Sequence, residues 1–490
     1  MPYRDLREYI STLEKRGMLK HVAKEVDKDW EITCIARWIF QSLPEEERYG
    51  VFFDNVKGFN VPVVTGIAAA SRDMYALALE VTPDKIYERW YEGLKHPLKA
   101  KVVSSGPVKE IIKRGDEVDL YELPNPIWTP GKDDGAYLSA TCVVTRDPVT
   151  RIQNMGAYRS RVHGKNRLGI AIRPHQHIGI HYYNNYEPAN EPMPIAIAMG
   201  VDPTLLLTSV AKMGYGLDEI EVSGGMRGAP IEVVKAETSD LYVPATAEYV
   251  IEGFVPPRVR ETEGRFGEYT GFIGRQGTNP IIEVKCITHR KQPIYQGMIS
   301  QIPPCEGGLA AVEAASAVLY NRLVYDLAEP GIKDACFTES GAVAHALVRM
   351  TPLYDGHSMK VGVLTSHLLD ANAAKIVTVV DDDIDIRDPY AVDWAVSFRV
   401  NPARDVLIID RCLAPQLDPS AGPRWGEPTE RERRLGSKMI IDATMKKDYP
   451  SISIPPKEYM ERALRDWHKT GLPEIKVKER TRLLLDKYPV

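Results

Sequence analysis

The sequence predicts a multidomain α+β protein. Its 490 residues exceed what a single hydrophobic core usually organises, so two to four domains are expected. The hydrophobic pattern changes character twice along the chain, from mixed to β-rich and back to mixed. We therefore expect an N-terminal α/β domain, a central β-barrel-like domain, a C-terminal α/β domain and a helical oligomerisation tail, over residues 1–115, 116–308, 309–455 and 456–490.

Helical and strand patterns alternate over the first hundred residues. A first helix is predicted over 3–16, because apolar residues recur there at helical spacing and Gly17 follows as a C-cap. Together the elements make a small α/β domain of ordinary size. The remaining helices are expected at 31–43, 72–79 and 83–93, and the strands at 50–54 and 61–66.

The pattern changes at 122–135, where ELPNPIWTPGKDDG is rich in proline and glycine and indicates a loop-rich domain entry. Short apolar runs separated by turn residues continue up to about residue 300, which predicts a barrel-like sheet. A long helical pattern at 309–327 then opens a second alternation of strands and helices, typical of an α/β domain. The last helices are expected near 364–374, 456–469 and 474–487.

Composition excludes several classes of protein. The net charge is −5 and the charges are interspersed, so no basic block stands out that would bind nucleic acid. Six scattered cysteines without a CxxC pair predict reduced thiols. No apolar run approaches the roughly 20 residues of a membrane helix, and the charged N-terminus lacks a signal-peptide core. We expect a soluble cytoplasmic protein, and Leu483–Leu485 at the chain end predict a homo-oligomer.

Three segments carry side chains that suit a hard divalent cation. Asn154 offers an amide oxygen in NMGAYR, and RPHQHIGIH offers His175 and His177, which strand geometry would place on one face. Glu237 follows an apolar strand in VVKAETSD. Amide, imidazole and carboxylate together would form a site for Mn²⁺ or Mg²⁺ rather than a zinc–thiolate site. Each residue alone is more often an ordinary strand-end or surface side chain.

Other charged residues suggest acid–base and anion chemistry. Arg159 could bind a carboxylate through a bidentate fork. Glu263 and Glu268 bracket the turn in EGRFGEYTG, which can fold both acids toward one cavity, where desolvation would leave a proton donor. Lys375 could hold a phosphate. The alternatives are a surface arginine, an exposed acidic turn and an interdomain salt bridge.

The common signatures of nucleotide and acyl-transfer enzymes are missing from the sequence. There is no GxxxxGK[ST] loop, no GxGxxG after a strand and no GxSxG elbow. ATP hydrolysis, ordinary NAD chemistry and serine acyl transfer therefore lack their usual anchors.

Taken in order, these segments resemble those of the UbiD-type decarboxylases. The resemblance includes DLREYISTLEKRGMLKHVAKEVD, LPNPIWTPGKDDGAY, NMGAYR, EVVKAETSDLYVPATAEYVIEG, EGRFGEYTG, VDDDIDIRD and RLGSKMIIDAT. It implies a central split β-barrel that binds prenylated FMN through Mn²⁺ or Mg²⁺, with K⁺ nearby. It also implies a separate flavin prenyltransferase that supplies the cofactor, and a homo-oligomer, either dimer or hexamer.

The resemblance also implies roles for residues. The catalytic set is Arg159, Glu263 and Glu268, and Lys375 matches the lysine that binds the cofactor phosphate. His177 is preferred to His175 as a ligand. The implied metal ligands are Asn154, His177 and Glu237. The implied cofactor-binding residues are Asn154, Gly156, Ala157, Tyr158, Arg159, Gln176, His177, Met226, Glu237 and Lys375, with Met226 placed near K⁺.

The implied activity is reversible, non-oxidative decarboxylation of an aromatic, heteroaromatic or other α,β-unsaturated carboxylic acid. Loss of CO₂ from an sp² carbon leaves a carbanion without an electron sink, which a covalent adduct with the prenylated flavin would provide. Arg159 would hold the substrate carboxylate and Glu268 would protonate the carbon. Tyr158 in NMGAYR favours an aryl acid over a cinnamate-type acid, and CoA thioesters stay open.

Two rival interpretations of the sequence remain. One is a flavin oxidoreductase that uses plain FMN, in which the arginine and the two glutamates would be coincidental. The other is a non-catalytic subunit of a multi-subunit carboxylase, against which the complete catalytic set argues.

Overall fold

The computed structural model describes residues 2–274, 276–369, 373–413, 417–421 and 435–488. It divides into two compact units, Met1–Ala314 and Ala315–Val490. The first unit contains the N-terminal and central parts of the chain, and the second contains the C-terminal α/β part and the tail.

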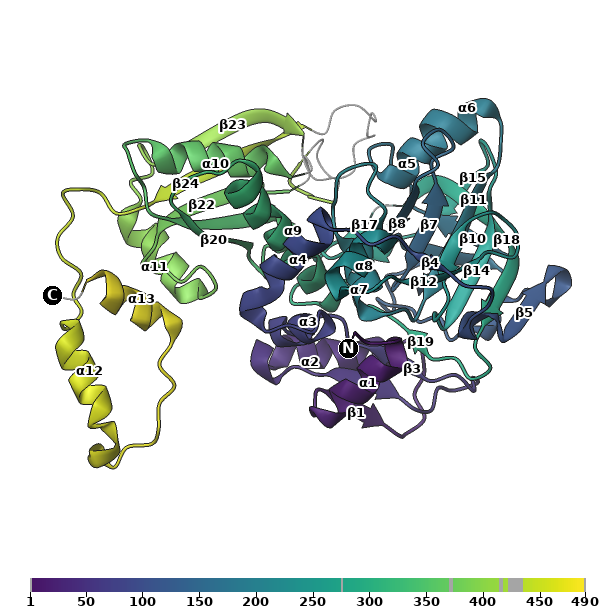
Figure 1. Cartoon of the computed structure of the whole chain (residues 1–490), viewed down its shortest axis with the longest axis horizontal. Coiled ribbons are helices and arrows are strands. Elements are labelled where there is room, and N and C mark those ends of the chain that lie inside the picture. Colours follow the sequence, from purple (N-terminus) through teal and green to yellow (C-terminus); the bar gives the residue numbers. More distant parts are fainter. Residues whose placement is uncertain (1, 275, 370–372, 414–416, 422–434, 489–490) are drawn as a thin grey trace. The chain divides into compact units, whose positions relative to one another are not determined.

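A four-stranded sheet with helices on it forms the N-terminal part of the first unit (Figure 1). Helix α1 starts where the Asp5 side chain accepts hydrogen bonds from the first free N–H groups, and its apolar stripe is buried. The last strand of the sheet returns from far along the chain. The elements are α1 (Leu6–Lys15), α2 (Glu31–Ser42), α3 (Arg72–Ala78) and α4 (Ile86–Lys95), and the sheet order is β1 (Leu19–Val22), β2 (Gly50–Phe53), β3 (Val63–Thr65) and β19 (Tyr295–Gln296).

The central part is β-rich, as predicted, and its main sheet has ten strands. The path through this sheet is β6 (Tyr137–Leu138), β9 (Ser160–Gly164), β10 (Arg167–Ile170), β18 (Gly277–His289), β14 (Tyr249–Val255), β11 (Met193–Met199), β7 (Cys142–Arg146) and β8 (Gln153–Gly156). Strands β5 (Ile111–Arg114) and β15 (Arg260–Glu263) pair with the long strand β18. Apolar side chains of these strands join those of the N-terminal sheet in one buried cluster.

Smaller elements complete the first unit. The first residues of two of the helices, His177 and Glu219, lie close together. The helices are α5 (His177–His181), α6 (Glu187–Ala189), α7 (Pro203–Val210) and α8 (Glu219–Arg227). The small sheets are β13 (Tyr242–Pro244), β12 (Glu232–Lys235) and β4 (Lys101–Val102), and the hairpin β16 (Phe266–Gly267) with β17 (Ile273–Gly274).

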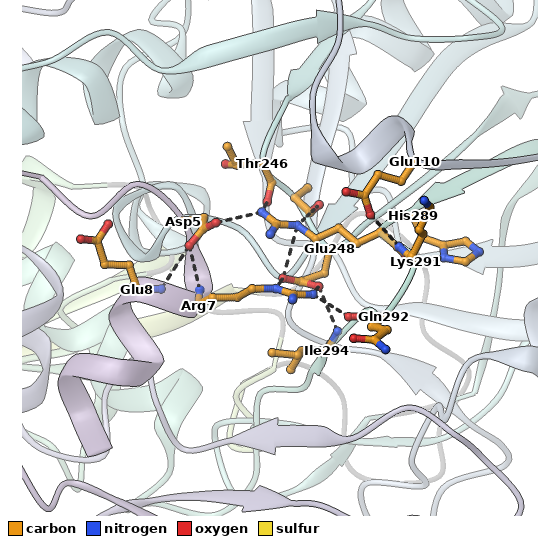
Figure 2. A network of polar contacts seen from close by, with 12 residues as sticks. Asp5, Arg7, Glu8, Glu110, Thr246, Glu248, His289, Lys291, Gln292 and Ile294 are labelled. Carbon is orange, nitrogen blue, oxygen red and sulfur yellow. Dashed lines mark hydrogen bonds and ion pairs between the residues drawn. The ribbon is translucent and has the colours of Figure 1, made fainter. Parts of the chain in front are cut away.

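A buried polar network joins the start of α1 to the central sheet (Figure 2). Arg7 donates two hydrogen bonds of 2.8 Å to the carboxylate of Glu248, which is fully buried. Arg290 donates to Asp5 at 3.1 Å and lies 3.5 Å from Glu248. A buried carboxylate is stable only when it is paired and hydrogen-bonded, so this network fixes the N-terminal helix against the sheet.

The second unit is an α/β domain, as predicted, and its sheet has five strands. Its order is β20 (Ile332–Phe337), β21 (His345–Met350), β22 (Ile376–Asp381), β24 (Leu435–Ala443) and β23 (Val406–Leu413). Helix α9 (Glu306–Asn321) leads into this unit, and α10 (His357–Leu368) and α11 (Pro389–Arg399) come after it in the chain. The buried Arg399, at the end of α11, donates to both oxygens of the buried Asp383.

Two predictions about the C-terminal part need correction. The helix expected near 364–374 is α10, which ends at Leu368, and residues 370–372 lie outside the described residues. The helix expected over 474–487 starts only at Glu479 as α13 (Glu479–Lys487), after α12 (Lys457–Arg465). Leu485 is buried in its own chain and Leu483 and Leu484 are partly exposed, and the interface at these helices stays a prediction.

Helix α13 is fixed to its own unit by ion pairs. Lys487 pairs with Asp382 and Arg480 with Asp388, each at 2.8 Å.

In the described part of the chain, no helix has both the length and the apolar character that crossing a membrane requires.

Candidate active site

Three polar side chains from separate elements converge at the end of β8. The amide oxygen of Asn154 lies 3.1 Å from Nδ1 of His177. The carboxylate of Glu219 lies 3.8 Å from the same nitrogen, and its second oxygen accepts a 2.7 Å hydrogen bond from the N–H of Met155. Asn154 and Glu219 are both buried. An amide oxygen, an imidazole and a carboxylate at one point form a donor set that fits Mn²⁺ or Mg²⁺.

His177 reaches this point from a helix, so the prediction of a strand carrying His175 and His177 is wrong. Strand β10 ends at Ile170, and the chain then turns, with the N–H of Gln176 donating to the carbonyl of Arg173. Gln176 is the N-cap of α5 and its side chain accepts a hydrogen bond from the N–H of Arg173. His177 is therefore the first residue of the helix, and His175 is exposed before it.

Glu219 is the carboxylate that sequence reasoning missed. It opens α8, and the preceding Asp218 caps the helix. The described residues contain no group of three or more His, Cys, Asp or Glu side chains suited to a metal ion. A site at Glu219 and His177 therefore depends on the amide of Asn154 for a third ligand.

The structure does not bring Glu237 to this place. Its carboxylate lies 2.9 Å from Nζ of Lys109 and contacts Arg114, and these cations hold the pKa of Glu237 below its usual value although burial opposes them. A carboxylate already paired with two cations is a poor ligand for a third. We replace Glu237 by Glu219 in the candidate metal site.

Met226 also lies elsewhere. It is fully buried in α8, where its carbonyl accepts a hydrogen bond from Arg89 of α4 and its side chain packs against Gly93. This carbonyl already has a cationic partner, and a second cation beside the guanidinium would be repelled. The expected K⁺ region is therefore not supported at Met226.

A small, partly open pocket adjoins Asn154 and His177. Tyr215 lines it, with its hydroxyl donating to Asp147 at 2.6 Å and its ring set edge-on to His177 at 5.3 Å. Burial lowers the pKa of the neighbouring His181 to about 4, so this imidazole is neutral at neutral pH and adds no charge that would repel a cation.

The backbone after Asn154 is held tightly. Gly156 is needed because a Cβ there would lie 2.6 Å from the ring of Tyr158. The N–H of Ala157 donates to the carbonyl of Ser209, and the N–H of Tyr158 donates to Thr141. These contacts fix the direction in which the chain delivers the next residue, Arg159.

Arg159 lies between two buried carboxylates. Its Nε is 3.4 Å from Oε1 of Glu263 and its Nη1 is 2.9 Å from Oε1 of Glu268. Its guanidinium also stands 5.4 Å above the ring of Phe266. The two acids are 2% and 6% exposed, so the turn between them does fold both toward one place, as the sequence predicts.

The hairpin β16–β17 determines where Glu268 points. The N–H of Glu268 donates to the carbonyl of Phe272, which closes the hairpin. A Cβ at Gly274 would approach Oε1 of Glu268 to 3.1 Å, so a larger residue there would crowd the carboxyl group. Three atoms of the cluster, Nε of Arg159, Oε1 of Glu263 and Oε1 of Glu268, are buried at ion-pair distance but without a hydrogen bond of good geometry.

Burial dominates the acid–base behaviour of both glutamates. Burial raises the pKa of Glu268, and the charge of Glu263 raises it further, although Arg159 opposes both. Burial also raises the pKa of Glu263, against the charges of Arg159 and Arg173. A carboxyl group with a raised pKa stays protonated closer to neutral pH and can then act as a proton donor.

Lys375 belongs to the second unit. Its Nζ donates to Asp418 at 2.7 Å and to Ser420 at 2.6 Å. Its assignment to a cofactor phosphate remains a prediction.

The comparisons with known proteins cover almost all of the chain. Family models of the 3-octaprenyl-4-hydroxybenzoate carboxy-lyases match in three parts: the N-terminal domain at residues 10–94, the Rift-related domain at 100–303 and the C-terminal domain at 312–443. The chain belongs to the UbiD family. This confirms the resemblance and the multidomain α+β architecture predicted from the sequence.

Solved structures of UbiD-class enzymes agree with this membership. HmfF from Pelotomaculum thermopropionicum in complex with FMN is 35% identical with a TM-score of 0.82, over 92% of this chain and 98% of that chain. An evolved dimeric form of HmfF in complex with prFMN is also 35% identical, with a TM-score of 0.80, over 92% and 97% of the two chains. Vanillic acid decarboxylase from Sedimentibacter hydroxybenzoicus is 30% identical with a TM-score of 0.84, over 96% and 100%. The UbiD-family chain is accordingly a carboxy-lyase of a flavin-binding class.

The raised pKa of Glu268 predicts a pH-dependent effect of E268Q on stability in the protein without cofactor. A carboxyl group whose pKa is raised by folding stabilises the fold while protonated, and this contribution is lost as pH rises through the folded-state pKa. Glutamine cannot ionise, so E268Q should gain in melting temperature relative to wild type as pH rises from about 5 to about 8. Thermal melts across this range test it, and a difference that shrinks with rising pH contradicts it.

Proposed function

We propose that this protein catalyses the reversible, non-oxidative decarboxylation of an aromatic or heteroaromatic carboxylic acid with prenylated FMN as cofactor. The observation that carries the proposal is the buried cluster of Arg159, Glu263 and Glu268 in a UbiD-family chain. A subunit without catalytic activity would not need these three residues in contact, which argues against the non-catalytic alternative.

Arg159 binds the carboxylate that will leave as CO₂. Its guanidinium offers a fork of donors that matches a carboxylate, and the contact with Glu263 limits its movement. Glu268, on the other side of Arg159, delivers a proton to the ring carbon after the C–C bond breaks. Burial raises the pKa of Glu268, which favours the protonated form that this step requires, and in the carboxylation direction Glu268 takes the same proton back.

Asn154, His177 and Glu219 would hold the divalent metal, and the metal would hold the phosphate of the flavin. Lys375 is the proposed second contact to that phosphate. The prenylated flavin, when bound, supplies the electron sink that an sp² carbon lacks on losing CO₂. Supply of this cofactor by a flavin prenyltransferase, a cytoplasmic location and assembly as a homo-oligomer belong to the proposal, and a dimeric form of HmfF is consistent with the last.

The proposed function predicts CO₂ release that depends on the modified flavin. Protein co-expressed with a flavin prenyltransferase should release CO₂ from at least one member of a panel of aryl and heteroaryl acids. Protein reconstituted with plain FMN should release none, because plain FMN lacks the electron sink. Equal turnover with plain FMN would refute the cofactor assignment, and redox turnover with plain FMN would favour the oxidoreductase alternative.

The candidate metal site predicts a contrast between two glutamates. E219Q should bind Mn²⁺ at least roughly tenfold more weakly, the scale on which metal sites respond to loss of a supporting group. Its fold should survive, because the glutamine oxygen can still accept from the N–H of Met155. E237Q is the matched control and should bind Mn²⁺ like wild type, since Glu237 contacts Lys109 and Arg114 instead.

Metal analysis after loading with Mn²⁺ and dialysis measures this contrast. Normal metal in E219Q together with loss in E237Q would return the role to Glu237.

A further inference from the structure

A second guanidinium lies next to the catalytic carboxylates. Arg173 follows β10, and its Nη1 donates a 2.9 Å hydrogen bond to the side-chain oxygen of Asn279. The side-chain nitrogen of Asn279 donates to Glu263, which in turn lies 3.4 Å from Arg159. Arg173, Asn279, Glu263 and Arg159 therefore form one continuous chain of polar contacts.

Arg173 differs from Arg159 in what it faces. Arg159 contacts two carboxylates, whereas the side chain of Arg173 contacts a neutral amide and, within the described ranges, forms no ion pair with a carboxylate. Burial lowers the pKa of Arg173 and the charge of Arg159 lowers it further, and together they outweigh the opposing charges of Glu263 and Glu268. A partly buried cation with no carboxylate of the described residues at ion-pair distance is unfavourable by itself, and a bound anion relieves that cost.

The position of Arg173 is set by the turn that also sets His177. The N–H of Arg173 donates to the side chain of Gln176 at 2.8 Å, and Gln176 caps the helix that begins at His177. The guanidinium is thus held by Asn279 at one end of the residue and by this turn at the other. An anion-binding group fixed in this way is preorganised, which increases its contribution to binding.

We propose that Arg173 binds a second carboxylate of the substrate, so that the substrate is an aromatic dicarboxylate that loses one of its two carboxylates. The proposal rests on the proposed decarboxylase function. A carboxylate is favoured over a phenol because the guanidinium fork matches a planar anion, and a simple phenol, with a pKa near about 10, is neutral at neutral pH.

The chemistry of this step balances without another reactant. The bond from the ring carbon to the carboxylate held by Arg159 breaks and CO₂ leaves. The proton of Glu268 forms the new C–H bond, and Glu268 recovers a proton from solvent. The carboxylate on Arg173 is unchanged, so it keeps the ring in place while the carbon is protonated, and the product is the aromatic monocarboxylate.

The test compares matched substrates with and without the second charge. Benzene, pyridine and naphthalene dicarboxylates are each assayed beside the corresponding monocarboxamide, which has nearly the same shape. Wild type should prefer the dicarboxylate in kcat/KM by roughly 10- to 100-fold, the scale of a hydrogen-bonded charge. R173M should lose this preference mainly through the dicarboxylate, and R173K should keep part of it. R167M, which changes an arginine of β10 that pairs with Glu261, is the control and should keep the preference.

Two results would overturn the proposal. One is a wild-type enzyme that does not distinguish the members of each pair. The other is an equal loss for both members in R173M, which would mean that Arg173 only positions Glu263 through Asn279.

Binding measurements separate this proposal from the proposed function. If wild type releases CO₂ from none of the acids, the proposed function fails. Isothermal titration of the same pairs into wild type and R173M then still decides the role of Arg173. Tighter binding of the dicarboxylate that disappears in R173M supports it, and equal binding of both members by wild type overturns it.

Discussion

A buried guanidinium between two buried carboxylates is the interaction around which the rest of the site is arranged. Removing Arg159, Glu263 and Glu268 from water is costly, and the cost is offset only if the charges meet at close range. The structure achieves this with strands, since Arg159 immediately precedes β9 and Glu263 ends β15. The same desolvation that makes the cluster expensive raises the pKa of Glu268 and so creates the proton donor.

Two short segments each serve two purposes. The stretch from Asn154 to Arg159 carries a candidate metal ligand at one end and the catalytic arginine at the other. The turn before α5 places Arg173 near Glu263 and starts the helix at His177. Because each segment is fixed by backbone hydrogen bonds, the candidate metal site and the carboxylate cluster are held at a set spacing. A change in either segment is therefore expected to affect both.

The sequence predicted the elements whose signals lie within a few neighbouring residues. Helix α1 was predictable because its apolar stripe and its Asp5 cap lie within a few residues of one another. The convergence of Glu263 and Glu268 followed from the turn between them. The return of β19 to the N-terminal sheet is a long-range pairing that no local signal predicts. His177 was placed on the wrong element, because alternation in PHQH is equally compatible with a turn entering a helix.

The choice between Glu219 and Glu237 shows where sequence reasoning ends. Glu237 comes just after a strand and Glu219 begins a helix, so both stand at the boundary of an element. Only the fold shows that Lys109 and Arg114 contact Glu237. A usable signal was present, since Asp218 and Glu219 open a helix just after a glycine-containing loop. Arg173 begins the segment RPHQHIGIH, but only its histidines drew attention there, and the case for Arg173 comes from its contact with Asn279 and from the lack of a carboxylate at ion-pair distance among the described residues.

Deuterium exchange at the reacting carbon tests most directly whether Glu268 is the proton donor in a decarboxylase site. Holoenzyme incubated with product in D₂O should place deuterium on the carbon that loses CO₂. E268Q should keep its flavin and metal, because Glu268 contacts Arg159 and neither Asn154, His177 nor Glu219. It should nevertheless stop this exchange, and its turnover should fall roughly a hundredfold, as expected on loss of a general acid. Normal deuterium incorporation and near wild-type turnover in E268Q would show that another group, with Glu263 the next candidate, delivers the proton.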